Sequence, residues 1–576
     1  MDNLPVSPVI SPRILHRDRR AFLRTFAATL AVLPSARMQG EGRAIGPPEL
    51  GSRDQESLRI RQNAAFFESA QPVATQFNNG DEASLPGYIG CFTKGLPHDS
   101  FVEVDTEAYQ SLLQALSTGI QGDFENIIRG SGMKLINPEA SFAFDLEGAD
   151  SHCLACPPAP AFSSAQAAAE AVELYWQALA RDVSFADYAS SPVIQAAGKD
   201  LSQLSGFQGP KLTDGTVDAS TIFRINAPGC LDGPYVSQFL WKPIPVNSTW
   251  VQQQYRVPGP GVDFLTDYAE WEVLQSGLPP YRDYSFDPTP RYIANGRALA
   301  EWVHYDFLYQ AFHNAALILA NQGPESILNT NPYWNPTNPY KKSKVQTGFS
   351  TFGLPHVCGW LGAAAVAALH AAWYQKWCVH RRLRPEELGG RAHQTLAGIK
   401  SYPVSPDLLQ SAALATAFKT NGTYLLPQAF PEGCPLHPSY PAGHATVAGA
   451  CSAVLKAFFD ENGLVTDCVT PSADGSSLLP LDDVALTVGG EINKLAVNIA
   501  MGRDFAGIHY RSDLMSGFEL GEQVAIAMMQ DLLGTMTEDF AGFEFTRMDG
   551  TSVQINKEPA MPEGPCSIKY HPVAAS

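Results

Sequence analysis

The sequence feature that most constrains the fold is a series of long apolar helical segments in the second half of the chain. From about residue 297 onward, apolar residues recur at the three- and four-residue spacing of an α-helix. Six helices are expected there, at 298–321, 359–383, 407–420, 443–459, 481–500 and 512–533. Because such helices must bury their apolar faces against one another, we predict a mainly α fold.

The rest of the chain has a different character. Between about residues 46 and 290 it is rich in proline and glycine, and only 165–180 has the pattern of a clear amphipathic helix. Near the end, 543–555 alternates about Asp549-Gly550, which predicts a β-hairpin. We therefore expect four parts: an N-terminal segment (1–43), a loop-rich helical part (44–296), a helical core (297–540), and a hairpin with a C-terminal tail (541–576).

The overall charge limits the partners of this protein. The 576 residues include 39 Lys and Arg against 58 Asp and Glu, a formal net charge of −19. Nucleic acids and anionic membranes are bound through excess basic residues, so neither is an expected partner. The longest apolar run, 360–373, is shorter than a membrane span and contains His370, so it reads as a buried helix.

Residues 1–43 depart from this acidic balance, with seven Arg and three acids. Arg19-Arg20 precedes an apolar run at 26–34, followed by small residues, as in a twin-arginine export signal. The alternative is a disordered basic arm. An export signal would place the protein in the periplasm or outside the cell.

The ten cysteines do not form a metal-site pattern. Cys153 and Cys156 make a lone CxxC, which is compatible with a redox or metal pair, a structural disulfide or two unrelated thiols. If the protein is exported, some of its thiols should be bridged. His304 and His313 lie among apolar and aromatic residues, and we assign them a structural role.

The first chemically informative segment is 326–385, which contains no Asp or Glu and ends in a dense group of cations. Such a segment must either face carboxylates from elsewhere, form a solvated basic helix end, or bind an anion. Lys376 and Arg384 are eight residues apart, about 12 Å along a helix. Both side chains could bind one oxyanion only if the helix ends near Leu383 and the chain bends Arg384 back.

Two further segments could complete an anion site. Gly443 precedes an apolar helical run, so it marks a helix N-terminus whose free N–H groups and positive dipole end would favour an anion. His444 would lie in the first turn. Farther on, Arg503 and His509 occupy a glycine-containing join between two apolar helices, and Asp513 is placed at i, i+4 to orient a neighbouring imidazole or guanidinium.

Three motifs follow one another along the chain: Lys-x7-Arg-Pro, Pro-Ala-Gly-His and Arg-x5-His-x3-Asp. In this order they resemble the vanadate site of the vanadium-dependent haloperoxidases. These enzymes share a superfamily with the phosphatidic-acid-type phosphatases. The likeness to the algal-type bromoperoxidases extends over about residues 88–555 and rests on the segments 92–98, 144–160, 374–376, 380–386, 426–430, 437–440 and 521–526. This resemblance implies two four-helix bundles and a homodimer or larger homo-oligomer.

The resemblance also implies a role for each matching residue. His509 would bond to vanadium, and the vanadate oxygens would be held by Lys376, Arg384, Arg503 and the Gly443 amide. His444, which also lies at the cofactor, would take a proton from hydrogen peroxide, and Lys376 would make the bound peroxide more electrophilic. A halide would then be oxidised to hypohalous acid, which halogenates small organic acceptors. Vanadium would act as a Lewis acid, so no haem is required.

Two positions bear on the halide. His437, seven residues before His444, matches a histidine typical of the bromoperoxidase branch, which favours bromide and iodide and adds His437 to the expected catalytic residues. Trp373 would form part of the halide-side wall, although a plain core role is the alternative.

Two departures from the family are expected to matter. Ala442 replaces the family serine, so one hydroxyl that would hydrogen-bond the cofactor is missing, at a cost of about 1–3 kcal/mol. The segment 329–347, where algal relatives bind calcium, contains Lys341, Lys342 and Lys344 and no carboxylate, so no calcium is expected there. The alternative functions are an acid phosphatase using the same pocket, with His509 as nucleophile and His444 as acid, and a non-catalytic oxyanion-binding oligomer.

Overall fold

The computed structural model describes residues 50–283, 285–320, 331–556 and 569–571 of the chain. The chain divides into two compact units, Met1–Arg59 and Ile60–Ser576. Helix α2 (Leu50–Ala70) spans the boundary, and the other described elements belong to the second unit. The expected export signal lies outside the described residues.

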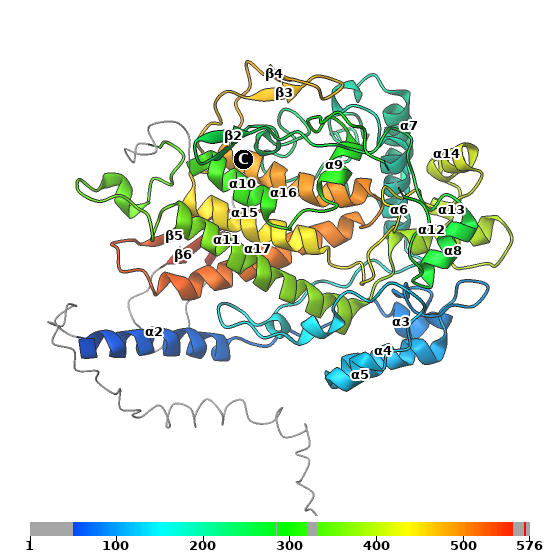
Figure 1. Cartoon of the computed structure of the whole chain (residues 1–576), viewed down its shortest axis with the longest axis horizontal. Coiled ribbons are helices and arrows are strands. Elements are labelled where there is room, and N and C mark those ends of the chain that lie inside the picture. The colour runs from blue at the N-terminus through cyan, green and yellow to red at the C-terminus, as the bar shows by residue number, and fades with distance from the viewer. Residues whose placement is uncertain (1–49, 284, 321–330, 557–568, 572–576) are drawn as a thin grey trace, which may run out of the picture. The chain divides into compact units, whose positions relative to one another are not determined.

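The described residues are mainly helical, as predicted (Figure 1). The first half contains α3 (Asp81–Ser84), α4 (Thr106–Thr118), α5 (Gln121–Glu125), α6 (Ala165–Leu179), α7 (Pro192–Gln203) and α8 (Tyr268–Gln275). The second half contains α9 (Gly296–Trp302), α10 (Gln310–Ala320), α11 (Leu354–Trp373), the π-helical η9 (Tyr374–His380), α12 (Pro385–Leu396), α13 (Pro406–Leu409), α14 (Ala412–Asn421), α15 (Gly443–Phe458), α16 (Val488–Phe505) and α17 (Arg511–Leu533). Short 3-10 turns connect them at Pro86–Tyr88, Pro138–Phe142, Ser151–Cys153, Phe185–Asp187, Gln238–Leu240 and Pro339–Lys342.

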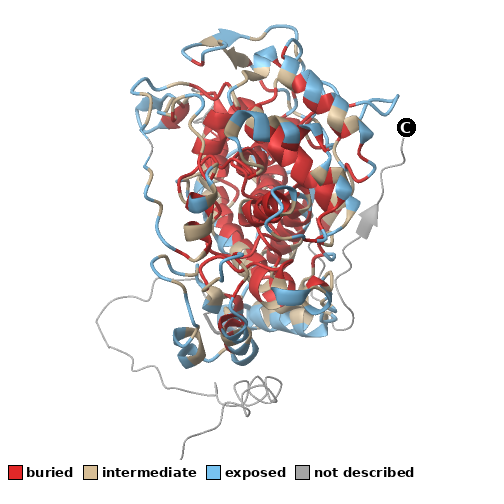
Figure 2. Ribbon diagram, turned by 90° about the vertical axis from the view of Figure 1, so that its right-hand side faces the viewer, coloured by how far each residue is buried: buried red, intermediate tan, exposed pale blue. Residues whose placement is uncertain are grey.

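The core of the second unit is built around α15, which packs against α10, α11, α16 and α17. All residues of α15 except His444 are buried, and so is the whole of α16. Figure 2 shows these central helices enclosed by less buried elements. Helices that are buried on all sides need no polar face, and some of the polar side chains they carry, such as Glu491 and Lys494 of α16, pair with one another. The grouping into two four-helix bundles stays a prediction.

Three short antiparallel sheets accompany the helices. They pair β1 (Ile244–Val246) with β2 (Thr249–Val251), β3 (Val469–Pro471) with β4 (Leu478–Pro480), and β6 (Ser552–Asn556) with both β5 (Gly542–Thr546) and β7 (Lys569–His571). The expected hairpin at 543–555 is confirmed, with Phe543 opposite Ile555. Asp549 shapes the turn, because its carboxylate accepts the Thr551 N–H at 2.8 Å.

Several expected helices have different limits. The segment 298–321 is two helices rather than one, because residues 303–309 break away to carry Asp306 into the interior. The segment 407–420 is likewise divided, into α13 and α14. Helix α16 begins at Val488 rather than 481, because 478–480 form β4 and Thr487 caps the helix by accepting the Gly490 N–H.

Other helices were not expected from the sequence. In the loop-rich first half, α4, α7 and α8 are short and lie between proline- and glycine-rich segments. Helix α12 was not expected either, and it begins at Pro385, a position where the missing N–H is not needed.

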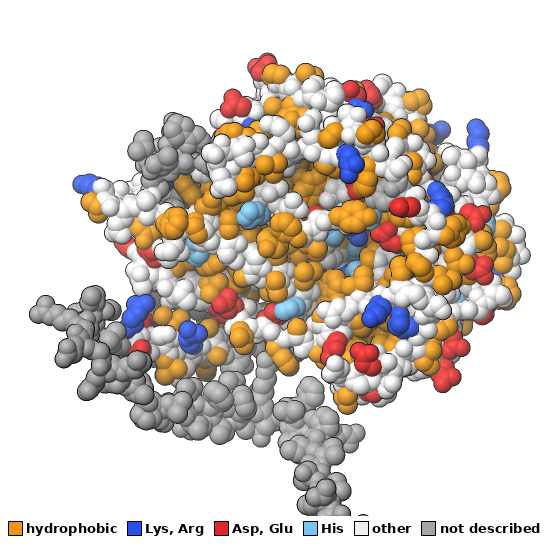
Figure 3. Space-filling model, in the orientation of Figure 1, with side chains coloured by type: hydrophobic (Ala, Val, Ile, Leu, Met, Phe, Trp, Pro, Cys, Tyr) orange, Lys and Arg blue, Asp and Glu red, His pale blue; other side chains and the backbone are white. Residues whose placement is uncertain are grey.

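Within the described residues, one continuous helix, Leu354–His380, is long and apolar enough to span a membrane by length and composition, and 50% of its most apolar window is buried within the protein. It is longer than the apolar run 360–373 because it extends through the π-helical turn. Its packing on α15 and α17 is that of a core helix. On the face shown in Figure 3, apolar side chains cover much of the centre, and charged side chains of both signs are scattered mostly toward the periphery.

Candidate active site

The turn after α11 brings two distant cations of the sequence to one place. The π-helical turn Tyr374–His380 ends the helix three residues earlier than expected, and Arg381 takes a left-handed conformation with φ 43°. The chain then bends back through Arg384, which immediately precedes α12. This is the bend that a shared oxyanion site for Lys376 and Arg384 requires.

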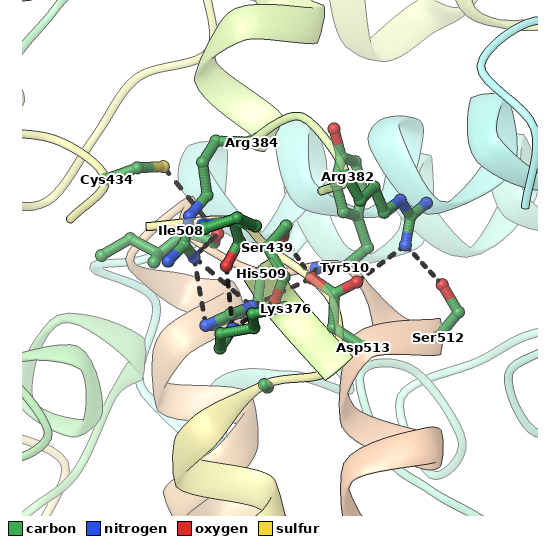
Figure 4. A network of polar contacts seen from close by, with 12 residues as sticks. Lys376, Arg382, Arg384, Cys434, Ser439, Ile508, His509, Tyr510, Ser512 and Asp513 are labelled. Atoms are coloured by element: carbon green, nitrogen blue, oxygen red, sulfur yellow. Dashed lines mark hydrogen bonds and ion pairs between the residues drawn. The ribbon is translucent and has the colours of Figure 1, made fainter. Parts of the chain in front are cut away.

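Lys376 and Arg384 are fully buried and bonded to backbone carbonyl groups (Figure 4). Lys376 Nζ donates to the carbonyl oxygens of Pro438 and Ser439, each at 2.8 Å. An ammonium group has three donors, so one N–H of Lys376 is left for a further acceptor. Burial and the neighbouring Arg384 lower the pKa of Lys376 well below its ordinary value. A bound anion would stabilise the charged ammonium group and raise the pKa of Lys376 again.

Arg384 is the point where the three expected segments meet. Its Nε donates to the carbonyl oxygen of His437 at 2.8 Å, and its Nη1 donates to that of Ile508 at 3.0 Å. Burial lowers the pKa of Arg384 as well. Lys-x7-Arg-Pro, the 437–444 segment and the 503–513 segment therefore lie together, as the resemblance implies.

The N-terminus of α15 faces this group of cations. Ala442 occupies the cap position and provides no side-chain hydrogen bond to the first turn. The first amide groups of the helix have no intrahelical acceptor, so they are available to an anion. A Cβ atom on Gly443 would lie 3.3 Å from the Trp373 ring, so Trp373 packs closely against this glycine.

His444 is bound to an acid that sequence reasoning missed. Its Nε2 lies 2.9 Å from Oδ1 of Asp306, which the break between α9 and α10 carries into the interior. A carboxylate only accepts, so Nε2 carries the proton and Nδ1 is the basic nitrogen. Burial lowers the pKa of His444, although Asp306 opposes this shift. The only signal for Asp306 in the sequence is an isolated acid within an apolar helical segment.

Arg503, in the last turn of α16, brings a third cation. Its Nη1 donates to the carbonyl oxygen of Val303 at 2.7 Å, whereas its buried Nε has no hydrogen-bond partner among the described residues. Burial lowers the pKa of Arg503 to about 10. An unsatisfied buried guanidinium donor is costly unless a ligand accepts from it.

The contacts of His509 define its tautomer. Nδ1 lies 2.9 Å from Oδ2 of Asp513, and Nε2 lies 3.1 Å from Nη1 of Arg384. An arginine can only donate and a carboxylate can only accept, so Nδ1 bears the hydrogen and Nε2 bears the lone pair. Burial and the adjacent cations lower the pKa of His509 well below its ordinary value. A neutral imidazole with its Nε2 lone pair toward the site is the form that binds a metal.

His437 lies behind Arg384 rather than beside His444. Nη2 of Arg384 lies 3.0 Å from Nδ1 and 3.2 Å from Nε2 of His437, and Nδ1 also lies 3.1 Å from the Pro438 carbonyl oxygen. Burial, Arg384 and Lys376 lower the pKa of this histidine well below its ordinary value. The ring of Trp373 lies 4.9 Å from the His437 ring, centroid to centroid. Both residues therefore line the site.

The structure separates the purposes considered for the cationic segment. Arg381 and Arg382 face carboxylates, Glu82 at 2.6 Å and Asp513 at 2.7 Å. Lys376, Arg384 and Arg503 form no ion pair with any described residue, although all three are buried. A solvated basic helix end is thereby ruled out, and what remains is a buried group of three cations, a neutral imidazole and a helix N-terminus.

Two further sequence interpretations can be compared with the structure. His304 pairs with Glu432 at 2.7 Å and stacks on Phe430, which agrees with a structural role. Cys156 is a buried free thiol, so it is not bridged to Cys153.

Comparisons with known proteins agree with this arrangement. Residues 356–538 match the family model described as the VCPO second helical-bundle domain. The chain is 36% identical to a vanadium-dependent bromoperoxidase of Ascophyllum nodosum, covering 89% of this chain and 94% of the relative, and 34% identical to one of Corallina officinalis, covering 89% and 100%. The solved homohexameric second vanadate-dependent bromoperoxidase of Ascophyllum nodosum superposes with a TM-score of 0.84 at 30% identity, covering 92% of this chain and 95% of that one. Identity at this level over nearly the whole length shows that the chain belongs to the vanadium-dependent bromoperoxidase family.

Proposed function

We propose that this protein is a vanadate-dependent haloperoxidase that oxidises bromide and iodide with hydrogen peroxide to hypohalous acid, which then halogenates small organic compounds. The observation that carries this proposal is the group of three buried cations without carboxylate partners, Lys376, Arg384 and Arg503, around the Nε2 lone pair of His509. Burying so much positive charge is favourable only with a multiply charged anion in place. The named relatives support the activity, and nothing in the comparisons favours the phosphatase alternative.

The residues present fit vanadate as the cofactor. The unsatisfied Nε of Arg503 and the remaining N–H of Lys376 supply donors for its oxygens, as do Arg384 and the Gly443 amide. His509 supplies the one neutral nitrogen ligand. When bound, the vanadium centre provides Lewis-acid activation of hydrogen peroxide without a change in oxidation state.

His444 is placed to act as the general base. Because its Nε2 hydrogen is donated to Asp306, its Nδ1 can accept a proton from hydrogen peroxide and later return it. Its lowered pKa keeps Nδ1 unprotonated near neutral pH. His444 is also the one residue of α15 that is not buried, since 12% of its side-chain surface remains accessible.

Lys376 and His437 act on the reacting oxygen and the halide. Lys376 directs positive charge at the oxygen that the halide attacks, which stabilises the negative charge left behind. His437 holds Arg384 in place through its ring and, with Trp373, forms one wall of the site. We keep bromide and iodide as the halides because His437 matches the bromoperoxidase branch.

The remaining proposals concern assembly, calcium and location. The homohexameric neighbour supports a homo-oligomer for this chain. We still expect no calcium at 329–347, because this segment has three lysines and no carboxylate of its own. The fold does bring two acids near it: Glu538 accepts a hydrogen bond from Tyr340 at 2.8 Å, and Asp539 lines the same pocket. Export through the twin-arginine segment is proposed from the sequence alone.

One experiment tests the function. The purified protein is freed of bound oxyanions, incubated with orthovanadate, and assayed for peroxide-dependent bromination. Bromination should require vanadate and disappear in His509→Ala. Phosphate-ester hydrolysis is measured without vanadate in the same preparation. Absence of bromination at saturating vanadate, or unchanged bromination in His509→Ala, would show the proposal to be wrong.

A further inference from the structure

A continuous buried chain of polar contacts leads away from the proposed vanadium ligand to helix α6. Figure 4 shows its first part, from His509 through Asp513 to Arg382. It runs from His509 to Asp513, then to Arg382, and ends at Glu170 of α6. The side chains of all four residues are at most 3% exposed. Neither Arg382 nor Glu170 touches the cations of the site, so neither has a role in the proposed chemistry so far.

Asp513 is the centre of this chain. Its Oδ2 accepts from His509 Nδ1 at 2.9 Å, from the Tyr510 amide at 3.1 Å and from the Ser439 hydroxyl. Its Oδ1 accepts from Nη1 of Arg382 at 2.7 Å. With only donors around it, the carboxylate has one preferred orientation, and that orientation requires the hydrogen of His509 to be on Nδ1.

Arg382 is held firmly at the other end. Its Nη2 donates to Oε2 of Glu170 at 3.1 Å, and the Ser512 hydroxyl bridges the two residues with 2.8 Å contacts to each. Its guanidinium also lies 3.9 Å from the centroid of the Tyr510 ring. The backbone of Arg382 is also fixed, because its carbonyl oxygen accepts the Ser439 N–H at 3.0 Å. Glu170 thus fixes the direction from which Arg382 approaches Asp513.

We propose that Glu170 and Arg382 are positioning residues for vanadate binding, which fix Asp513 and, through it, the ring orientation and the Nε2 lone pair of His509. This inference rests on the proposed function. Partners of metal-ligating histidines typically contribute about 10–100-fold to metal affinity. Asp513 is that direct partner, and Glu170 acts two contacts beyond it through Arg382, so the lower end of that range is expected.

The fold contains a matched control for this pair. One turn farther along α6, Glu173 forms a buried ion pair with Arg511, with a 2.8 Å contact between its Oε2 and the arginine Nε. That pair also joins α6 to the start of α17, and both side chains are at most 3% exposed. In the described part of the chain, no hydrogen bond or ion pair joins the side chains of Glu173 or Arg511 to Asp513 or His509. Loss of the Glu173 charge should therefore disturb the same helix interface without reorienting the vanadium ligand.

The experiment measures orthovanadate binding to oxyanion-free protein by titration calorimetry. Glu170→Gln should raise the Kd about tenfold, whereas Glu173→Gln should leave it within about twofold of wild type. Arg382→Lys, which replaces the planar fork of two nitrogens by a single donor atom, should also raise the Kd. The KM for bromide in vanadate-saturated enzyme should be unchanged in Glu170→Gln, because the halide wall is intact.

The possible results separate cleanly. If Glu170→Gln and Arg382→Lys bind vanadate as wild type does, or if Glu173→Gln weakens binding equally, the positioning role is wrong. If wild-type protein does not bind vanadate, the proposed function itself fails. Should Glu170→Gln not fold, as judged by near-UV circular dichroism, the comparison of Arg382→Lys with Glu173→Gln decides the question in the same way.

Discussion

Position 442 determines how many donors reach the cofactor. Ala442 caps α15 in an extended conformation without a side-chain hydrogen bond. A serine there could accept from a first-turn amide while donating its hydroxyl hydrogen to a vanadate oxygen. Ala442→Ser should therefore stabilise the protein by about 1 kcal/mol and tighten orthovanadate binding by up to roughly tenfold. Thermal unfolding and titration calorimetry measure the two effects, and weaker binding in Ala442→Ser would contradict this account of the missing hydroxyl.

Asp306 controls the proton chemistry of His444. Burial lowers the pKa of His444, and the Asp306 carboxylate partly restores it. Asp306→Asn should lower that pKa further, because the opposing charge is removed while the imidazole stays buried. The neutral form of His444 would then persist to lower pH, so the acidic limb of the pH–kcat profile should move toward lower pH.

The maximum kcat of Asp306→Asn should also fall about tenfold, because an amide orients the imidazole less firmly than a carboxylate does. Bromination rates between pH 4 and 8 test both effects. A limb that moves toward higher pH would mean that Asp306 does not face His444 in solution.

At the scale of elements, glycines allow α15 and α17 to approach closely. A Cβ atom on Gly521 would lie 1.9 Å from the Thr446 carbonyl oxygen, and one on Gly449 would lie 2.3 Å from that of Phe518. Both obstacles are backbone atoms, which cannot move aside. Gly521→Ala should therefore destabilise the protein by about 3 kcal/mol, and it should also weaken vanadate binding because α17 carries Asp513.

Gly359, an exposed glycine within α11, provides the matched control. A Cβ atom there would meet nothing within 4 Å. Gly359→Ala should stabilise the protein by roughly 1 kcal/mol through helix propensity alone. Urea unfolding of the two variants separates these effects, and equal midpoints would show that helix approach does not limit the α15–α17 interface.

The elements also show how far sequence reasoning reaches at this site. The residues Lys376, Arg384, Gly443, His444, Arg503 and His509 are brought together from the sequence through the resemblance of three motifs to the haloperoxidase family, since each motif alone also fits an ordinary helix end or join. Asp306 could not be found, since a break inside an apolar helical segment depends on tertiary contacts rather than local propensity. The Glu170–Arg382 contact is equally hidden, because it joins α6 to the turn before α12, and the two residues are 212 positions apart in the chain.

At the scale of the whole molecule, the acidic composition and the cationic site oppose one another. The chain carries a net charge of −19, yet three cations are buried together without carboxylate partners among the described residues. The negative surface disfavours large anionic partners, whereas a small oxyanion inside the site is surrounded by donors. Surface charge is screened by salt within about 8–10 Å, but buried charge is screened much less. Selectivity for a small anion thus follows from the burial of the cations as well as from their charge.

The buried, unpaired cations predict how the cofactor affects the free energy of unfolding. In the oxyanion-free protein, Lys376, Arg384 and Arg503 repel one another, and burial lowers the pKa of each. Orthovanadate should raise the unfolding temperature, with a stabilisation of about 2.7 kcal/mol at a concentration of 100 times the Kd. Phosphate should do the same more weakly, because it matches the charge and shape but forms no bond to His509.

His509→Ala isolates the contribution of that bond. In this variant the cations remain, so phosphate should still stabilise, whereas vanadate should lose its advantage over phosphate. Differential scanning calorimetry of both proteins with each anion provides the comparison. If vanadate stabilised His509→Ala as strongly as wild type, the site would bind oxyanions without distinguishing them. The metal–nitrogen bond would then not contribute to holding the cofactor.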